Sequence, residues 1–246
     1  MSGRLAGVRV LVTRPAHQAE NLCRMLEAEG GAVVRLPLLA IEPGTQIAEA
    51  RRRLAGGHDL WIFTSANAVR HAAPLATGAW PARLAAVGPA TAAAIAVAGH
   101  AAAATPLEGA SSEALLALPE LRALGGARVL LVTGEGGRRT LEQELSARGA
   151  TVERAEVYRR VPLPYAPDAV AAALRGIDVI VITSGESLDH IVRMTPEATR
   201  ASLFKKALVV PAARVVEKAR ELGFLQPPRL AEPMSDAALC AACAPT

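Results

Sequence analysis

Aromatic side chains are scarce in this sequence. Two Trp, two Tyr and three Phe make up only 3% of its 246 residues, too few for a nucleic-acid surface built on base stacking. Long apolar runs are also missing, since the richest stretch, residues 84–104, is interrupted by Gly88, Pro89, Gly99 and His100. No uninterrupted run reaches the roughly 20 residues that cross a bilayer. We therefore expect neither nucleic acid nor a membrane among the partners.

Cysteine is rare, with Cys23, Cys240 and Cys243 as its only occurrences. An odd number of thiols, together with an N-terminus (MSGRLAGVRV) that lacks the long apolar segment of a secretory signal, favours a reducing compartment, and we expect the cytoplasm. Cys240 and Cys243 form a single CxxC without a second ligand pair, and the five His show no metal-binding spacing. The sequence predicts no metal site.

Lysine is the third scarce residue type, because only Lys205, Lys206 and Lys218 occur among 27 basic residues. Arginine therefore supplies nearly all the positive charge, and its planar guanidinium binds carboxylates and phosphates through paired hydrogen bonds. One interpretation is an anionic ligand, and the other is a GC-rich genome that favours Arg codons. With 51% apolar and 20% charged residues, the chain is predicted to be globular and long enough for two domains.

What the sequence does contain is an internal repeat. The segment LWIFTSANAV at Leu60–Val69 recurs about 120 residues later as VIVITSGESL at Val179–Leu188. In each copy an apolar strand runs into Thr-Ser and then into a helical pattern. Strands that alternate with helices predict an α/β protein with two similar doubly wound parallel sheets. The period alone places a boundary near Gly125 and leaves open an exchange of strands between the halves.

Other segments fit the same pattern of strands and helices. VRVLV at Val8–Val12 matches RVLLV at Arg128–Val132, and Ala32–Ile41 is predicted as a strand interrupted by Pro37. A short strand is also predicted at residues 101–104. Such strands in open α/β sheets bind ligands at their carboxyl ends.

The polar residues at the predicted strand ends are the first candidates for a site. Thr64 and Ser65 follow one strand, and Thr183 and Ser184 follow its repeat. Their hydroxyls and free amides suit a ligand, while helix N-capping is an alternative and compatible role. Arg14 and Arg138 follow two further equivalent strands, either to bind an anion or as solvated charges.

The loop GEGGRR at Gly134–Arg139 is a second candidate. It follows a strand and opens a helix, where glycine backbone N–H groups can approach an anion. It lacks the Lys-Ser/Thr ending of a P-loop and the spacing of a dinucleotide site, so a plain turn is the alternative. Neither a carboxylate pair nor a nucleophile elbow is evident. The residues by themselves support a two-lobed anion binder.

Five segments in order, VLVTRP, IFTSANAV, AVGPATAAA, LLVTGEGGRRTLEQEL and AEVYRR, resemble the uroporphyrinogen-III synthase family over nearly the whole chain. The resemblance implies a cofactor-free enzyme that cyclises hydroxymethylbilane, a linear tetrapyrrole with eight carboxylates, to uroporphyrinogen III in haem biosynthesis. Water is lost, and ring D is inverted through a spiro intermediate. We expect the enzyme to be a monomer.

The resemblance also implies the domain organisation. Two doubly wound domains would be joined by a two-stranded linker, with a cleft between them. Domain 1 would take residues 1–37 and 164–246, and domain 2 residues 42–159, with residues 38–41 and 160–163 as the linker strands.

Site residues follow from the matched motifs. Tyr158 in AEVYRR matches a tyrosine that faces the cleft, and Thr91 in VGPAT matches a threonine of domain 2, so we expect both to be catalytic. The expected substrate-binding residues are Thr13, Arg14, Thr64, Ser65, Ala66, Gly88, Gly134, Glu135, Gly136, Arg138, Thr183, Ser184, Gly185 and Arg214.

One loop departs from the family pattern. Many relatives carry a hydroxyl residue where this chain has Pro211-Ala212-Ala213-Arg214, and we expect Arg214 to bind a propionate or acetate there. Two other functions stay open: a non-enzymatic two-lobed sensor of a small anion, and a sugar-phosphate or nucleotide transferase that uses the GEGGRR loop.

Overall fold

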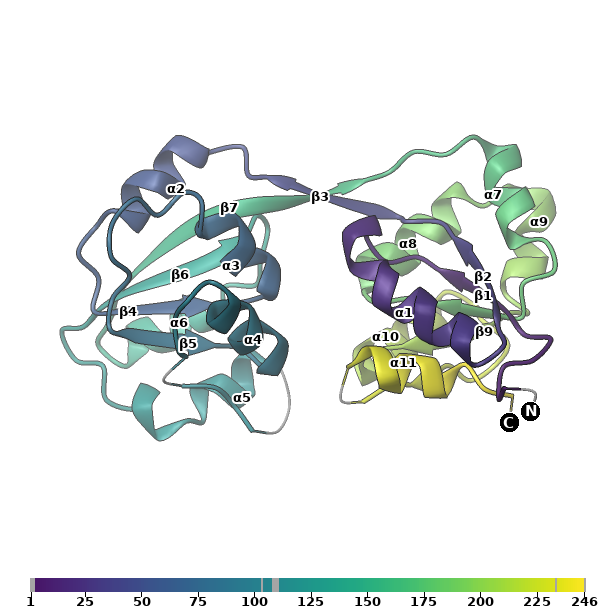
Figure 1. Cartoon of the computed structure of the whole chain (residues 1–246). Coiled ribbons are helices and arrows are strands. Elements are labelled where there is room, and N and C mark those ends of the chain that lie inside the picture. The colour runs from purple at the N-terminus through teal and green to yellow at the C-terminus, as the bar shows by residue number, and fades with distance from the viewer. Residues whose placement is uncertain (1–2, 103, 108–110, 233, 246) are drawn as a thin grey trace. The chain divides into compact units, whose positions relative to one another are not determined.

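The computed structural model describes residues 3–102, 104–107, 111–232 and 234–245. The chain divides into two compact units (Figure 1): unit 1 consists of Met1–Ala40 and Val161–Thr246, and unit 2 of Ile41–Arg160. Each unit holds one five-stranded sheet, so the α/β class with two parallel sheets is confirmed.

In unit 1 the sheet has the strand order β10-β9-β8-β1-β2, and every pair is parallel. Its strands are β1 (Arg9–Val12), β2 (Ala32–Arg35), β8 (Val179–Val181), β9 (Ala207–Val210) and β10 (Arg229–Leu230). Its helices are α1 (Ala16–Ala28), α7 (Pro167–Leu174), α8 (Gly185–Met194), α9 (Glu197–Leu203), α10 (Ala213–Glu221) and α11 (Asp236–Ala242).

Both faces of this sheet are buried, as the unbroken apolar strands require. Successive side chains point to opposite faces, so Val10 and Val12 pack with α1 and α11, while Leu11 packs on the other face with α7, α8, α9 and α10. Two separate apolar clusters therefore cover the sheet, which is the doubly wound arrangement.

In unit 2 the sheet order is β3-β7-β6-β4-β5, and the pairs among β4, β5, β6 and β7 are parallel. Its strands are β3 (Leu39–Pro43), β4 (Leu60–Phe63), β5 (Arg83–Ala86), β6 (Arg128–Gly134) and β7 (Thr151–Pro162). Its helices are α2 (Ile47–Leu54), α3 (Ala66–Ala72), α4 (Pro89–Val97), α5 (Ser112–Leu116), the 3-10 helix η1 (Pro119–Leu121) and α6 (Thr140–Ala147). Helices α2, α3 and α4 cover one face, and α5, η1 and α6 cover the other.

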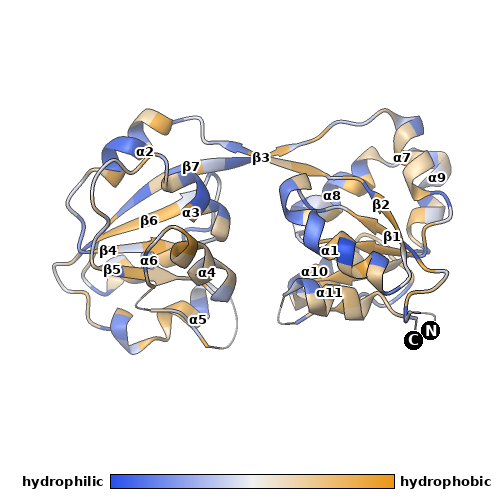
Figure 2. Ribbon diagram, viewed as in Figure 1, coloured by the Kyte–Doolittle hydropathy of each residue, from blue (hydrophilic) through white to orange (hydrophobic). Residues whose placement is uncertain are grey.

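Apolar residues gather on these strands, as β6 shows in Figure 2. The interruption predicted at Pro37 is present, because Pro37 has no N–H to donate to a sheet and the segment forms two strands, β2 and β3. Two elements differ from the predicted pattern. The short strand expected at 101–104 contributes only a parallel bridge from Ala104 to Ala85, and residue 103 lies outside the described residues. Gly134, expected in a loop, is the last residue of β6.

The two sheets show that the sequence repeats exchange strands. By sequence β1 corresponds to β6 and β8 corresponds to β4, yet β1 pairs with β8, and β6 pairs with β4. Each sheet therefore combines strands from both halves of the chain. The boundary near Gly125 that the period suggested is wrong as a unit boundary, because Gly125 lies within unit 2.

Candidate functional site

The candidate site lies where the strand order of each sheet reverses. In unit 1 the chain leaves β1 toward β2 on one side, while β8 flanks β1 on the other; in unit 2 the corresponding pair is β6 and β4. The carboxyl ends of strands at such a switch point are the usual ligand site of open α/β sheets. Thr13 and Arg14 follow β1, and Thr64 and Ser65 follow β4. The edge formed by these strand ends is therefore the candidate site of each unit.

In unit 2 the central residue is Tyr158, near the end of β7. Its side chain is 5% exposed. Strand β6 has a register shift between Thr133 and Gly134, which places Gly134 opposite Tyr158. A Cβ atom on Gly134 would lie 2.5 Å from Cζ of the tyrosine, so only glycine lets the ring pack there. The N–H of Glu135 donates to the carbonyl of Tyr158 at 2.8 Å, which fixes the backbone as well.

Ser65 is the residue that the fold brings to Tyr158. It is the N-cap of α3, with φ −166° and ψ 160°, and its hydroxyl oxygen accepts the N–H of Ala68 at 3.1 Å. The same hydroxyl lies 3.1 Å from the hydroxyl of Tyr158. N-capping and contact with the site are thus combined in one side chain.

Three further residues, Thr64, Thr133 and His71, lie beside this pair. The hydroxyl of Thr64 donates to that of Thr133 at 3.0 Å, which joins the ends of β4 and β6. The ring centroid of His71, on α3, lies 5.8 Å from that of Tyr158. Neither Thr133 nor His71 was predicted, because only the sheet order and the helix position bring them to this edge.

Thr91 lies in the first turn of α4, after the N-cap Gly88 and Pro89 at the first helical position. Gly88 accepts the N–H groups of Thr91 and Ala92 at 3.0 Å each, and the side chain of Thr91 is only 4% exposed. Among the described residues no hydrogen bond joins Thr91 to Tyr158. The two expected catalytic residues therefore share a unit without a direct polar contact.

The GEGG loop, residues 134–137, is held in place by the carboxylate of Glu135. The side chain of Glu135 accepts the hydroxyl of Thr45 at 2.7 Å and also its backbone N–H. These two donors, the N–H first, lower the pKa of Glu135 below its usual value. Gly136 follows with φ +68°, a conformation that favours glycine. Glu135 thus stabilises the loop through Thr45.

Arg138, further along the loop, has a different environment. Its guanidinium lies 3.3 Å from Glu113, with side-chain exposures of 57% and 60%. An ion pair so exposed contributes little to stability. Arg138 can therefore leave Glu113 for an anionic ligand at small cost.

In unit 1 the polar side chains at the corresponding edge of the sheet are held by hydrogen bonds and an ion pair. The hydroxyl of Thr13, only 1% exposed, donates to the carbonyl of Val181 at 2.7 Å and joins β1 to β8. Arg14 forms an ion pair with Asp236 of α11, and its side chain is 13% exposed. Asn21 donates to the other oxygen of Asp236 at 2.7 Å. An anion that binds Arg14 must therefore share it with Asp236, which the sequence did not predict.

Ser184 caps α8 as Ser65 caps α3. Its hydroxyl oxygen accepts the N–H of Ser187 at 3.1 Å and lies 2.9 Å from the hydroxyl of Ser187. Lys218 of α10 crosses the first turn of α8, because a Cβ atom on Gly185 would lie 3.2 Å from Cδ of Lys218. The ammonium of Lys218 pairs with Asp189 at 2.8 Å. Lys218 is thus a positive group near the predicted residues Ser184 and Gly185.

The remaining predicted residues lie at the N-termini of helices. Thr183 precedes the cap of α8, Ala66 is the first residue of α3, and Arg214 is an exposed residue in the first turn of α10. The first N–H groups of a helix have no partner within the helix and so can bind an anion.

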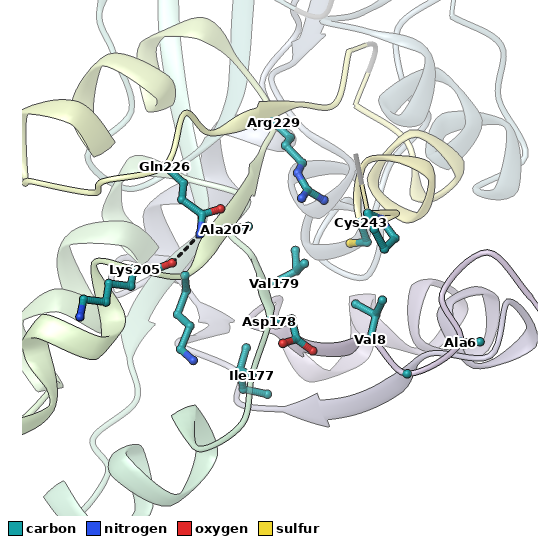
Figure 3. A pocket seen from close by; sticks show the side chains of 13 residues that line it. Ala6, Val8, Ile177, Asp178, Val179, Lys205, Ala207, Gln226, Arg229 and Cys243 are labelled. Carbon is teal, nitrogen blue, oxygen red and sulfur yellow. Dashed lines mark hydrogen bonds between the residues drawn. The ribbon is translucent and has the colours of Figure 1, made fainter.

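A hollow of about 470 Å³ lies at the opposite edge of the unit 1 sheet (Figure 3). It includes Asp178, Lys205, Arg229 and Cys243 and contains no predicted site residue. Asp178 accepts the N–H of Arg9, and Arg229 donates to two carbonyls of the C-terminal segment. Burial raises the pKa of Cys243 to about 12, so its thiol stays protonated near neutral pH. Asp178, Arg229 and Cys243 thus have structural roles.

Within the parts of the chain that the structure describes, no three His, Cys, Asp or Glu side chains gather closely enough to hold a metal ion. Over the same residues, no helix has the length and apolar character needed to cross a membrane.

Comparison with known proteins gives a consistent result. The family model described as "Uroporphyrinogen-III synthase HemD" matches residues 20–232. The uroporphyrinogen-III synthase of Salmonella typhimurium is 36% identical over 225 residues, which cover 87% of this chain and 92% of the relative. That of Escherichia coli is 34% identical over 226 residues, with the same two coverages.

Solved structures share the fold at lower identity. A mutant uroporphyrinogen III synthase of Thermus thermophilus has a TM-score of 0.62 at 22% identity, over 95% of this chain and 96% of the other. The uroporphyrinogen-III synthetase of Helicobacter pylori has a TM-score of 0.61 at 12% identity, over 95% and 97%.

Proposed function

This chain belongs to the uroporphyrinogen-III synthase family, and we propose that it is the enzyme that cyclises hydroxymethylbilane to uroporphyrinogen III in tetrapyrrole biosynthesis. The reaction loses water and inverts ring D. The observation that carries this proposal is the family match, which extends over most of both units. The relatives described above are all synthases, so the sensor and the transferase have no support among them.

Tyr158 is our proposed proton donor. The hydroxyl of the hydroxymethyl group on ring A must leave as water, while the pyrrole nitrogen supplies the electrons and a protonated azafulvene forms. A phenol is protonated at neutral pH and can donate a proton to the leaving oxygen. Such general acid catalysis typically contributes about 10²–10⁴-fold. The buried and fixed position of the ring supports this role.

For Thr91 we propose a lesser role. An aliphatic hydroxyl is a poor acid, so Thr91 would orient the substrate rather than protonate it. Its place in the first turn of α4, after the carboxyl end of β5, supports contact with the substrate at the same edge of unit 2.

We propose that the eight carboxylates of the substrate bind across many weak sites. The supporting features are the N-terminal ends of α4, α8 and α10, where the helix dipole favours an anion, together with Arg14, Arg138 and Arg214. We also propose that the enzyme acts as a cytoplasmic monomer without a cofactor. The free thiols of Cys23, Cys240 and Cys243 support a reducing compartment.

The test is to incubate the purified protein with hydroxymethylbilane and to separate the isomeric products. Spontaneous closure gives uroporphyrinogen I, so formation of isomer III requires a catalyst. We expect isomer III to dominate in proportion to the amount of protein. Production of isomer I alone, at the rate seen without protein, would overturn the proposed function.

A further inference from the structure

The single hydrogen of the Tyr158 hydroxyl has two possible uses. The hydroxyl oxygens of Tyr158 and Ser65 lie 3.1 Å apart, so one of them donates to the other. If Tyr158 donates to Ser65, no hydrogen remains for a substrate. If Ser65 donates to Tyr158, the phenol hydrogen stays available. The direction of this hydrogen bond therefore decides whether Tyr158 can act as an acid.

The backbone of α3 favours donation by Ser65. The N–H of Ala68 can only donate, and it does so to the Ser65 oxygen at 3.1 Å. That oxygen is thus an acceptor in one bond and keeps its own hydrogen for another. In a chain of hydrogen bonds, accepting one bond strengthens donation of the next. The hydroxyl of Tyr158 is the acceptor that the structure places within reach of that hydrogen.

Tyr158 cannot turn away from Ser65. Its ring packs on the Cα of Gly134, and its carbonyl is held by the N–H of Glu135 at 2.8 Å. Its side chain is 5% exposed, and such close packing disfavours a change of rotamer. The phenol oxygen is therefore held at a fixed distance from the α3 cap.

We propose that Ser65 is a positioning residue that directs the phenol hydrogen of Tyr158 toward the departing hydroxyl of the substrate. This inference rests on the proposed function and on the role of Tyr158 in it. Tyr158 transfers its proton to the leaving oxygen as the C–O bond breaks and water departs. The hydrogen bond from Ser65 then stabilises the phenolate. The proton that ring D later releases on ring closure restores the phenol, so the cycle balances with one water lost.

The test is a double-mutant cycle on Ser65→Ala and Tyr158→Phe. We expect Ser65→Ala to lower kcat for isomer III at least about tenfold, with a smaller change in KM. The double variant should be no slower than Tyr158→Phe, because Ser65 acts only through the phenol. Ser65→Thr should restore most of kcat, since threonine keeps both the cap and the hydrogen. If the two losses multiply instead, Ser65 acts independently and the inference fails.

Ser184→Ala is the matched control. Ser184 has the same cap geometry, with φ −158° and ψ 155°, but its hydroxyl partner is Ser187. Its loss removes the same kind of cap without touching a tyrosine, so its effect should multiply with that of Tyr158→Phe. Because Ser184→Ala also removes a helix N-cap, it controls for any loss of stability that comes from capping alone.

A spectroscopic measurement separates positioning from capping. The chain has two tyrosines, Tyr158 and Tyr165, and Tyr165 donates to the carbonyl of Pro37 in unit 1. With ¹³C at the tyrosine Cζ, Ser65→Ala should move the Tyr158 signal and leave that of Tyr165 in place. An unmoved Tyr158 signal would overturn the inference. Full activity of Tyr158→Phe would overturn it together with the acid role of Tyr158, whereas absence of isomer III in the native protein would overturn the proposed function itself.

Discussion

Tyr158 can lose its hydroxyl without losing its packing, because its ring contacts Gly134 through carbon atoms. We therefore predict that Tyr158→Phe lowers formation of isomer III at least about tenfold, while the melting temperature and substrate affinity barely change. Product separation, thermal unfolding and calorimetric binding check the three parts. Near-normal turnover would make Tyr158 a packing residue and would leave the chemistry to ordered water and backbone amides.

Gly134 is the residue on which the position of Tyr158 depends. In Gly134→Ala the added methyl group would lie 2.5 Å from the ring, so the ring or the strand must move. We predict a loss of about 1–3 kcal/mol in unfolding free energy, as for other overpacked sites, and a lower kcat. Gly78→Ala is the control, because a Cβ atom there meets nothing within 4 Å. Equal stability of the two variants, measured by urea unfolding, would contradict this.

The two predicted arginines should respond differently to substitution. Arg14→Ala and Arg138→Ala should each weaken substrate binding by about 1–3 kcal/mol, as expected for one charged hydrogen bond, and added salt should weaken binding further. Only Arg14→Ala should also lower stability, because it leaves the partly buried Asp236 without its cation, whereas Arg138 and Glu113 are exposed. Complete loss of binding in either variant would contradict a site distributed over many contacts.

At the residue scale, the sequence located the strand ends but not the contacts between them. Thr64-Ser65 was recognisable because a hydroxyl residue between an apolar strand and a helix is a cap or a ligand site. The contact of Ser65 with Tyr158 spans 93 positions, and that of Arg14 with Asp236 spans 222. Periodicity describes local structure only, so these partners could not be predicted from it.

At the scale of elements, the prediction succeeded where apolar periodicity was strong. The strands before Thr64 and Thr183 were found because each is an unbroken apolar run. Helices α7 and α9 were missed, since each is short and has a proline at its start, Pro167 as the first residue of α7 and Pro196 as the N-cap of α9, which reads as a connection. The register shift at the end of β6, which places Gly134 opposite Tyr158, was missed too, because no turn motif marks it in the sequence.

The GEGG loop should show a pH dependence that comes from Glu135. Its pKa is lowered in the folded protein by the donors of Thr45, so its contribution to stability is present at neutral pH and is lost as the pH falls below the usual value of 4.5 through the folded pKa. We predict that Glu135→Gln is less stable than the native protein at pH 7 and that the difference vanishes in acid.

Urea unfolding at several pH values measures this difference. Glu144→Gln is the matched control, because Glu144 is an exposed residue of α6 with no ion pair in the described part of the chain. Its stability should follow that of the native protein at every pH. A difference for Glu135→Gln that grows in acid would contradict the assigned role of Thr45.

At the scale of the whole molecule, the repeat indicated two similar sheets but left the pairing of their strands open. The period of about 120 residues suggested a boundary near Gly125 and did not exclude an exchange of strands, and the structure shows the exchange, because β1 pairs with β8 and β6 pairs with β4. Strands with similar apolar sequences could pair within one half of the chain or between the halves, so only the pairing in the structure decides between the two arrangements. The resemblance to a family with a linker of two strands suggested the exchange where periodicity did not.

This exchange predicts which fragments fold. Residues 41–160 contain both apolar clusters of unit 2 and the pairs β4–β5, β4–β6 and β6–β7. Residues 1–125 contain β1 and β2 without β8, and β4 and β5 without β6, so every sheet in that fragment lacks a central strand. We therefore predict cooperative urea unfolding for fragment 41–160 and none for fragment 1–125.

Both fragments carry the same two tryptophans, Trp61 and Trp80, and in the folded protein Trp61 is 1% exposed. Their emission should be that of buried indole in fragment 41–160 and of solvated indole in fragment 1–125. A cooperative transition in fragment 1–125 would mean that the halves fold independently and that strand exchange is not required.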